Sequence, residues 1–385
     1  PMKVLGLRVW ASDFNPHPSS LIPHPSERFG DEKLLIVTGL LVFFGLLMVY
    51  SSSGFIAAAD AKPDYYYFFK QIRILLVGIL AFLMGARVNL RFWKAGVIPG
   101  MIVLAIVMTA QLFFHLGPIV NGARRWVNFG LFNMQTSEVA RCLIIVFLAL
   151  VFSKRQDLLQ GIKKQLFIVL LAPALFMLLT LRQPDLSSAA VMGVIVVLML
   201  FLGGFNVWIL GSGGIIGLGA GIYVARHNPY QWQRIVEWLS GDNYQLVQSL
   251  VGFARGKLFG VGLNQGLQKW EFLPEPHTDF IFSIIAEEWG LIGTLAVLGA
   301  FIILFLRAIK IAGRQPDAFG FLLGAGLAGS LVILALVNIM VAIGLVPVTG
   351  LPLPFISSGG TSLVVSLWSM GILAQLGRRA EQGEF

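Results

Sequence analysis

The segment from Leu273 to Gly290 carries the ionisable side chains whose spacing says most about chemistry. Asp279 lies where a Pro-rich stretch, LPEPHT, meets a long apolar run. A carboxylate at the mouth of an apolar bundle is costly to ionise, which raises its pKa toward the range of a general base near neutral pH. Asp279 is therefore the leading candidate for a catalytic base. A second interpretation is that it caps a helix beginning with Phe280.

Two further carboxylates, Glu287 and Glu288, follow about two helical turns after Asp279. Charged side chains inside membrane helices usually face the bundle interior and find a partner of opposite charge. We expect one or both of these glutamates to pair with Arg141 or Arg182.

A second cluster consists of the segment NGARRW at 121–126 and the segment QTSEVAR at 135–141. Glu138 and Arg141 are three residues apart, so they share a helical face and could pair. Arg124 and Arg125 could hold lipid headgroups without specificity, or they could bind the pyrophosphate of a lipid-linked substrate through bidentate hydrogen bonds. The residues alone leave both interpretations open.

Two more clusters interrupt the apolar runs. RQPDL at 182–186 supplies hydrogen-bond donors, an acceptor and a kink, and its Asp185 could simply cap the next helix. The stretch from 344 to 360, GLVPVTGLPLPFISSGG, is rich in Pro and Gly and carries no charge. Such a stretch should dip into the membrane as non-helical backbone, which lipid tolerates only against protein or a water-filled cavity.

Composition places these clusters in a membrane protein. The 385 residues are 57% hydrophobic and 12% charged, with a mean hydropathy of +0.81, which a soluble domain could not cover with polar surface. The net charge of +9 then indicates cytoplasmic loops and anionic headgroups, and no nucleic acid is expected as a partner. A single cysteine, Cys142, and five scattered histidines support neither a disulfide nor structural zinc.

The chain is predicted to be an all-α polytopic membrane protein with about ten transmembrane helices and one membrane domain over 34–377. A long outer loop at 226–278, between helices 7 and 8, should hold one or two interfacial helices and a Gly-rich turn. Residues 1–33 are predicted to be a flexible cytoplasmic tail without a signal peptide, and 378–385 a cytoplasmic C-terminal tail. The spans are predicted at 34–58, 69–86, 95–115, 137–153, 165–181, 187–203, 206–225, 279–306, 319–344 and 361–377.

The short loops set the orientation. Lys and Arg concentrate in loops on one face, such as Arg307, Lys310 and Arg314, so this face and both termini are predicted to be cytoplasmic. The four clusters then lie at the opposite, outer face. Glycines four residues apart, at 213, 217 and 221 and at 320 and 324, are expected to let helices pack closely.

Taken together, the four clusters resemble the SEDS family of bacterial membrane proteins, which contains FtsW, RodA and SpoVE. The family's patterns correspond to NGARRW at 121–126, QPDL at 183–186, QKWEFLPEPHTDFIF at 268–282 and GLVPVTGLPLPFISSGG at 344–360. The sequences PEPHTDF and TGLPLPFISSGG are more similar to those of FtsW than to those of RodA. The chain departs from the usual pattern at Thr136, Arg141, Ser187 and Ser358, and only Arg141 replaces a charged residue, with its charge kept.

The resemblance implies an inverting peptidoglycan glycosyltransferase on the outer face of the bacterial cytoplasmic membrane. It would polymerise lipid II, the undecaprenyl-pyrophosphate-linked disaccharide pentapeptide, into β-1,4 glycan strands in cell division. Its partners would be a class B penicillin-binding protein and other divisome or elongasome proteins. The alternatives are a RodA-like elongation polymerase, a lipid II flippase or other transporter, and a non-catalytic scaffold for the penicillin-binding protein.

The resemblance places the family's essential aspartate on Asp279. A pyrophosphate leaving group also needs a charge sink, which could be a divalent cation, Mg or Mn, at an unknown site, or four basic residues on the outer side. Lys269 is the first choice among them because it lies ten residues before Asp279. The predicted substrate-binding residues are Lys269, Arg124, Arg125, Arg234, Glu138, Gln183, Asp185, Glu275, His277, Ser357, Gly359 and Gly360.

Overall fold

The computed structural model describes residues 31–59, 61–114, 117–118, 124–128, 130, 133–154 and 162–382. The tail predicted over 1–33 lies outside these residues up to position 30, and α1 already begins at Glu32. Residues 121–123 of the NGARRW segment also lie outside the described part. At the other end, α12 continues to Gln382, so most of the predicted C-terminal tail extends the last helix.

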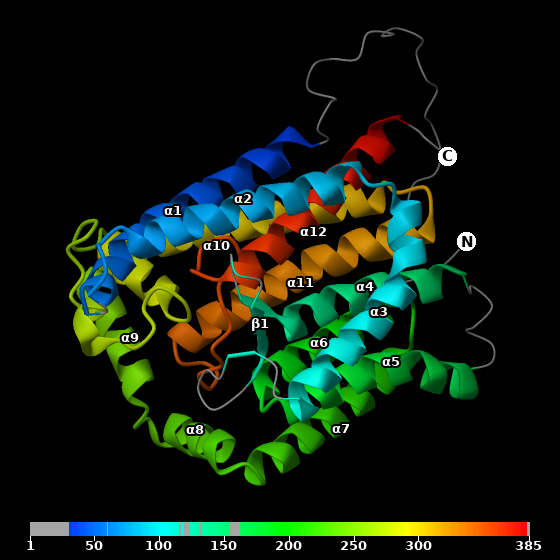
Figure 1. The fold of residues 1–385 in the computed structure, drawn as a ribbon, viewed down its shortest axis with the longest axis horizontal. Helices are drawn as coiled ribbons and strands as arrows, with labels where there is room; N and C mark the ends of the chain where they lie inside the picture. The colour runs from blue at the N-terminus through cyan, green and yellow to red at the C-terminus, as the bar shows by residue number, and fades with distance from the viewer. Residues whose placement is uncertain are drawn as a thin grey trace, which may run out of the picture.

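The described chain is almost entirely helical and forms one bundle (Figure 1). Each of the ten predicted spans coincides with a helix, and α10 extends beyond its predicted end at 306. The ten helices are α1 Glu32–Ala59, α2 Tyr66–Arg87, α3 Leu90–Phe113, α4 Thr136–Lys154, α5 Ile162–Arg182, α6 Leu186–Leu202, α7 Val207–Arg226, α10 Ile281–Gly313, α11 Ala318–Ala342 and α12 Gly360–Gln382.

Within the described residues, seven of these helices are long and apolar enough to cross a membrane by length and composition. Shorter apolar helices are found at Val169–Arg182 and Leu186–Leu202, and α7 has 20 residues. The polytopic all-α architecture is thus confirmed, and the count of ten crossings stays a prediction.

The most extensive helix contact joins α2 to α12 and includes close approaches at small residues. A Cβ atom on Gly371 would lie 2.2 Å from the Phe82 carbonyl oxygen, and one on Gly85 would lie 2.6 Å from that of Trp368. Helices in lipid associate by such close backbone approach. By contrast, no described residue lies within 4 Å of a Cβ placed on Gly213, Gly217 or Gly221, so the packing role predicted for this stripe on α7 is not realised within the chain.

The long segment between α7 and α10 folds into two helices, α8 Pro229–Ser240 and α9 Tyr244–Gly256, followed by a short π-helix at Gln268–Phe272. Asn228 and Asn243 cap α8 and α9 through their side-chain oxygens. α9 packs on α10 and α11, and α8 runs beside one end of the bundle (Figure 1). The two predicted helices are confirmed, and their position at a membrane surface stays a prediction.

α10 is broken at Gly290, whose φ of 64° places it in the left-handed region that favours glycine. The break frees backbone groups on both sides, and residues of the segment between α9 and α10 bind them. The amides of Val261 and Gly262 donate to the carbonyls of Glu287 and Glu288 at 2.9 and 3.0 Å. The non-helical backbone is therefore satisfied by protein, as a low-dielectric setting requires.

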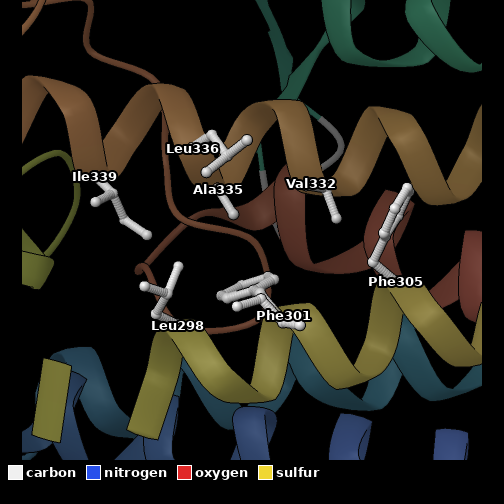
Figure 2. Close-up of a pocket in the computed structure, with 8 residues that line it drawn as sticks. Leu298, Phe301, Phe305, Val332, Ala335, Leu336 and Ile339 are labelled. Atoms are coloured by element: carbon white, nitrogen blue, oxygen red, sulfur yellow. The ribbon is translucent and has the colours of Figure 1, made fainter. Parts of the chain in front are cut away.

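A cavity of about 80 Å³ lies between α10 and α11 (Figure 2). Figure 2 shows Leu298, Phe301 and Phe305 of α10 facing residues of α11 such as Ala335 and Ile339. All of its lining side chains are apolar, so it offers no group for chemistry.

Candidate active site

A larger, polar cavity of about 380 Å³ contains Asp279 in its wall. It brings together residues from all four sequence clusters, from Arg125 to Gly360 along the chain. The wall is completed by α2, by α8 and by the hairpin of β1 Trp126–Asn128 and β2 Asn133–Gln135. The lining residues are Lys70, Ile74, Arg125, Trp126, Asn133, Gln135, Glu138, Pro184, Asp185, Leu186, Ser187, Ser188, Tyr230, Gln231, Arg234, Glu275, Thr278, Asp279, Thr349, Gly350, Pro352, Ser358, Gly359, Gly360, Thr361 and Ser362.

Asp279 precedes α10 and does not cap it. The helix begins at Ile281, its N-cap position is Phe280, and that residue makes no side-chain capping hydrogen bond. The backbone carbonyl of Asp279 instead accepts a 2.8 Å hydrogen bond from Nδ2 of Asn338, which also donates to the Leu351 carbonyl at 2.8 Å. Asn338 thus joins the start of α10 to the loop between α11 and α12. It bonds only the backbone of Asp279, whose side chain lines the cavity.

Removal from water raises the pKa of Asp279 from its ordinary 3.8 to about 7. The negative charge of Glu275 contributes to this rise, whereas Arg234 and a hydrogen bond from Thr278 partly offset it. Near neutral pH the carboxyl therefore exchanges its proton readily, as a general base must.

The loop between α11 and α12 approaches Asp279 closely. Gly350 has a φ of +70°, and a Cβ atom there would lie 3.2 Å from Oδ2 of Asp279. Ser357 does not line the cavity. Its hydroxyl donates to the Thr278 carbonyl at 2.6 Å and accepts from the Leu353 amide at 2.8 Å, so it holds this loop against the residue before Asp279. Gly359 and Gly360 do line the cavity, as expected for substrate-binding residues.

His277 lies behind this wall. It is buried, its ring lies 5.2 Å from that of Tyr67, and its carbonyl accepts from the Ser358 amide. Burial lowers the pKa of its imidazole, and the nearby Glu275 partly offsets this effect. The structure therefore gives His277 a supporting position, while Glu275, which is exposed, lines the cavity.

The opposite wall is built from the corner between α5 and α6. Asp185 caps α6 by accepting from the Ser188 amide at 3.1 Å, and its second oxygen accepts from Gln135 at 3.1 Å. Arg125 donates to the carbonyls of Gln183 and Pro184. The Gln183 side chain is buried behind the cavity and donates to the Gln111 side chain at 3.1 Å, so it acts on this wall indirectly.

Glu138 is buried and lines the cavity, but it forms no ion pair with Arg141 in the described part of the chain. Its Oε2 atom and the Nε atom of Arg141 are both without a hydrogen-bond partner there. The predicted pair on this helical face is therefore not made. A buried carboxylate oxygen left unpartnered beside a polar cavity is suited to accept a hydrogen bond from a ligand.

The positions of the four predicted pyrophosphate-binding residues differ. Arg234 lines the cavity, donates to the Val348 carbonyl at 3.3 Å and lies over the Tyr230 ring at 4.9 Å. Arg125 lines it as well. Arg124 donates to the Gly117 carbonyl and is absent from the lining.

The prediction that Lys269 binds the pyrophosphate is wrong, because Lys269 is buried away from this cavity. All three of its donor positions are taken: by Glu288 at 2.7 Å, by Asn264 at 2.7 Å and by Ser51 of α1 at 3.0 Å. A side chain with no free donor and 3% exposure cannot grip a pyrophosphate. Lys269 instead fastens the π-helix to α1 and α10.

The partners predicted for the two glutamates of α10 are also wrong. Glu287 pairs with Arg255 of α9 at 2.9 Å and accepts from the amides of Leu267 and Gln268, whereas Glu288 pairs with Lys269. Both carboxylates are buried, and both anchor the segment between α7 and α10.

Sequence reasoning missed Lys70, Thr361 and Asn338. Thr361 accepts from the Gln135 amide at 2.7 Å and docks the hairpin onto α12. Asn338 could have been found, since an amide within the apolar run of α11 is costly unless it has a role. Lys70 carried no such signal, because it lies at the edge of a predicted span.

The described residues contain no group of three or more His, Cys, Asp or Glu side chains placed to hold a metal ion. The carboxylates around the cavity do not form a ready-made cage for a resident divalent cation.

Comparison with known proteins identifies the family to which this chain belongs. The FtsW/RodA/SpoVE family, described as cell cycle protein, matches residues 31–382. The chain belongs to this family. It is 36% identical over 353 residues to the probable peptidoglycan glycosyltransferase FtsW of Trichlorobacter lovleyi, covering 90% of this chain and 92% of that protein. It is 35% identical over 356 residues to stage V sporulation protein E of Bacillus subtilis, covering 90% and 97%.

Solved structures agree with this membership. A chain of a peptidoglycan synthase complex aligns with a TM-score of 0.70 and 26% identity over 92% of this chain and 99% of that one. The rod shape determining protein RodA of Thermus thermophilus aligns with a TM-score of 0.67 and 26% identity over 92% and 99%. The FtsW/RodA/SpoVE resemblance is thus confirmed, and relatives named FtsW at 32–36% identity support an FtsW-like member. The chain is a multi-pass membrane protein.

Proposed function

We propose that this FtsW-like protein is a peptidoglycan glycosyltransferase that polymerises lipid II into β-1,4 glycan strands, with a role in cell division. The observation that carries the proposal is Asp279, a carboxyl with a pKa near 7 in the wall of a polar cavity built from all four sequence clusters. Relatives named probable peptidoglycan glycosyltransferase FtsW support the reaction class.

In this proposal the reaction is the one that the family resemblance implies, and residues of the cavity wall carry it out. The 4-hydroxyl of an acceptor GlcNAc attacks the anomeric carbon of a donor MurNAc, the bond to the polyprenyl pyrophosphate breaks, and the configuration inverts. Asp279 takes the hydroxyl proton, which is worth about 10²–10⁴-fold in rate. Arg234 lies beside Asp279 and supplies positive charge toward the substrate, and the buried Glu138 accepts a hydrogen bond from the bound sugar or peptide.

The cavity opens on the outer side of the bacterial cytoplasmic membrane in this proposal, with both termini cytoplasmic. Basic residues at the C-terminal end of α10, including Arg307 and Arg314, support that orientation. Substrate approaches sideways from lipid, because a C55 polyprenyl chain loses about 0.8 kcal/mol per buried CH₂ group on leaving it.

A class B penicillin-binding protein is the proposed partner, together with other divisome proteins. Support comes from the structural likeness to a chain of a peptidoglycan synthase complex. If the partner favours the active state, the isolated protein should turn over more slowly than the complex. Equal turnover with and without a cognate partner would count against this part of the proposal.

A divalent cation, Mg or Mn, would arrive with the substrate in this proposal. Mg²⁺ is often held by one or two carboxylates together with substrate phosphates, which fits a cavity without a group of three metal-ligating side chains among the described residues. Asp279 and Glu275, two carboxylates of the cavity wall, would hold it together with the substrate phosphates. When bound, it would neutralise charge on the leaving pyrophosphate.

Glycan synthesis by the purified protein tests the proposal. Labelled lipid II in detergent, with the partner present, should be converted into long glycans, and Asp279→Asn should not do so. Detergent removes the second compartment that a flippase needs, so polymer formation excludes a purely transporting role. A protein that assembles with its partner but never lengthens glycans would instead favour the scaffold alternative.

A further inference from the structure

Lys70 is a cation in the wall of the cavity that no sequence motif contains. It lies in the second turn of α2, is half-buried, and lines the cavity together with Ile74, one turn further on. Residues 67, 70, 71 and 74 share one helical face. The contacts of Tyr67 and Gln71 therefore fix where this face points.

Both contacts reach the loops that enclose Asp279. The Tyr67 ring lies 5.2 Å from that of His277, two residues before Asp279. Nε2 of the buried Gln71 lies 3.4 Å from the Ser357 carbonyl, and the Ser357 hydroxyl in turn holds the residue before Asp279. Lys70 lies between these two anchors, so its backbone is held in register with the candidate base.

Lys70 also keeps its donors available. Three basic residues line the cavity among those described: Lys70, Arg125 and Arg234. Arg125 is engaged by two backbone carbonyls, and Arg234 bonds the Val348 carbonyl and stacks on Tyr230. Lys70 forms no ion pair within the described part of the chain; its Nζ atom lies 5.7 Å from the centre of the Tyr67 ring, and its positive charge lowers the pKa of His277. Lys70 thus brings a full charge and three N–H donors to the cavity wall, with no carboxylate of the described chain paired to it.

We propose that Lys70 binds the pyrophosphate of the lipid-linked sugar substrate, the role that the buried Lys269 cannot fill. The proposal rests on the proposed function and names the residue that neutralises its leaving group. As the acceptor oxygen bonds to the anomeric carbon, the bond from that carbon to the pyrophosphate oxygen breaks and its electron pair stays on the pyrophosphate. The acceptor proton goes to Asp279. A lysine ammonium is a compact point charge that stabilises the charge developing on phosphate oxygen.

The test uses the full-length protein with its partner and compares Lys70→Gln with Lys70→Arg. Loss of a charge-assisted hydrogen bond should lower polymerisation of labelled lipid II about ten- to a hundredfold for Lys70→Gln. Lys70→Arg keeps the charge and should recover most of that loss. Lys62→Gln is the matched control, since it makes the same change eight residues earlier, outside the cavity lining, and should stay within twofold.

A binding measurement tests the role of Lys70 independently of the proposed function. Binding of labelled polyprenyl pyrophosphate and polyprenyl monophosphate is measured without turnover, so it remains informative if the parent protein fails to polymerise. The parent should prefer the pyrophosphate, and Lys70→Gln should lose that preference while Lys62→Gln keeps it. Activity within twofold of the parent for Lys70→Gln, or an unchanged preference for the pyrophosphate, would overturn the assignment.

Discussion

Replacing Asp279 by Asn should abolish glycan synthesis and make the folded protein more stable. The amide has nearly the same shape as the carboxylate, but it can neither take a proton nor carry charge. Loss of a general base lowers the rate by about 10²–10⁴-fold. The gain in stability follows from the raised pKa of the carboxyl.

The size of that gain can be worked out from the pKa. A rise from 3.8 to about 7 corresponds to roughly 4 kcal/mol of disfavoured ionisation, since each pKa unit is worth about 1.36 kcal/mol. Below about pH 4 the carboxyl is protonated in both the folded and the unfolded protein, and nothing is lost. As the pH rises toward 7 the unfolded protein ionises and the folded protein does not, so parent stability falls.

The assay therefore compares melting temperatures of parent and variant in detergent at several pH values, alongside polymerisation of labelled lipid II. The melting temperature of Asp279→Asn should exceed that of the parent by a margin that grows between about pH 4 and pH 7. Asp242→Asn is the control, because it makes the same substitution at an exposed position between α8 and α9. A variant that keeps more than a tenth of parent activity, or that melts below the parent at neutral pH, would refute the reasoning.

Three other perturbations test the surroundings of the base. Glu275→Gln removes a charge that raises the pKa of Asp279, so the acidic limb of the pH–rate profile should move to lower pH; an unmoved limb would contradict this coupling. Lys269→Ala leaves its glutamate partner buried and unpaired, so it should cost about 3–5 kcal/mol of stability; lost activity at an unchanged melting temperature would restore a substrate role. Gly350→Ala and Gly241→Ala both put alanine at positive φ and should lose similar stability, about 1–2 kcal/mol. Only Gly350→Ala should also lose activity, because its Cβ presses on the base.

The helices could be predicted well because lipid leaves few alternatives to them. Long apolar runs must satisfy their own backbone hydrogen bonds, so each run becomes a helix wherever it is long enough. The cap of α6 could also be predicted: Asp185 lies at its N-cap position, as one interpretation of the sequence held. What composition could not show is how far a helix continues past its apolar part, and α10 therefore extends to Gly313 and α12 to Gln382.

The site was predicted only in part because distance along the chain is a poor guide to distance in space. Lys269 precedes Asp279 by ten residues, yet the π-helix turns it toward Ser51 of α1 and away from the cavity. Lys70 is about two hundred residues from Asp279, yet it reaches the same cavity through the contacts of its helix. Pairings of this kind depend on tertiary packing, which no local pattern in one sequence encodes.

The segment of α10 before its break links the candidate base to the long segment between α7 and α10. Asp279 lies immediately before this segment, and Glu287 and Glu288 near its other end hold the loop through Arg255 and Lys269. The break at Gly290 separates the segment from the rest of α10, and the amides of Val261 and Gly262 hold it by donating to the carbonyls of Glu287 and Glu288. The base is thus carried by a short, separately anchored helix and not by the long apolar remainder of α10. Buried ion pairs add little net stability compared with apolar packing, but they fix a register because breaking one leaves an unpaired buried charge. The two glutamates therefore fix the position of the short helix that follows Asp279, and with it the position of the base.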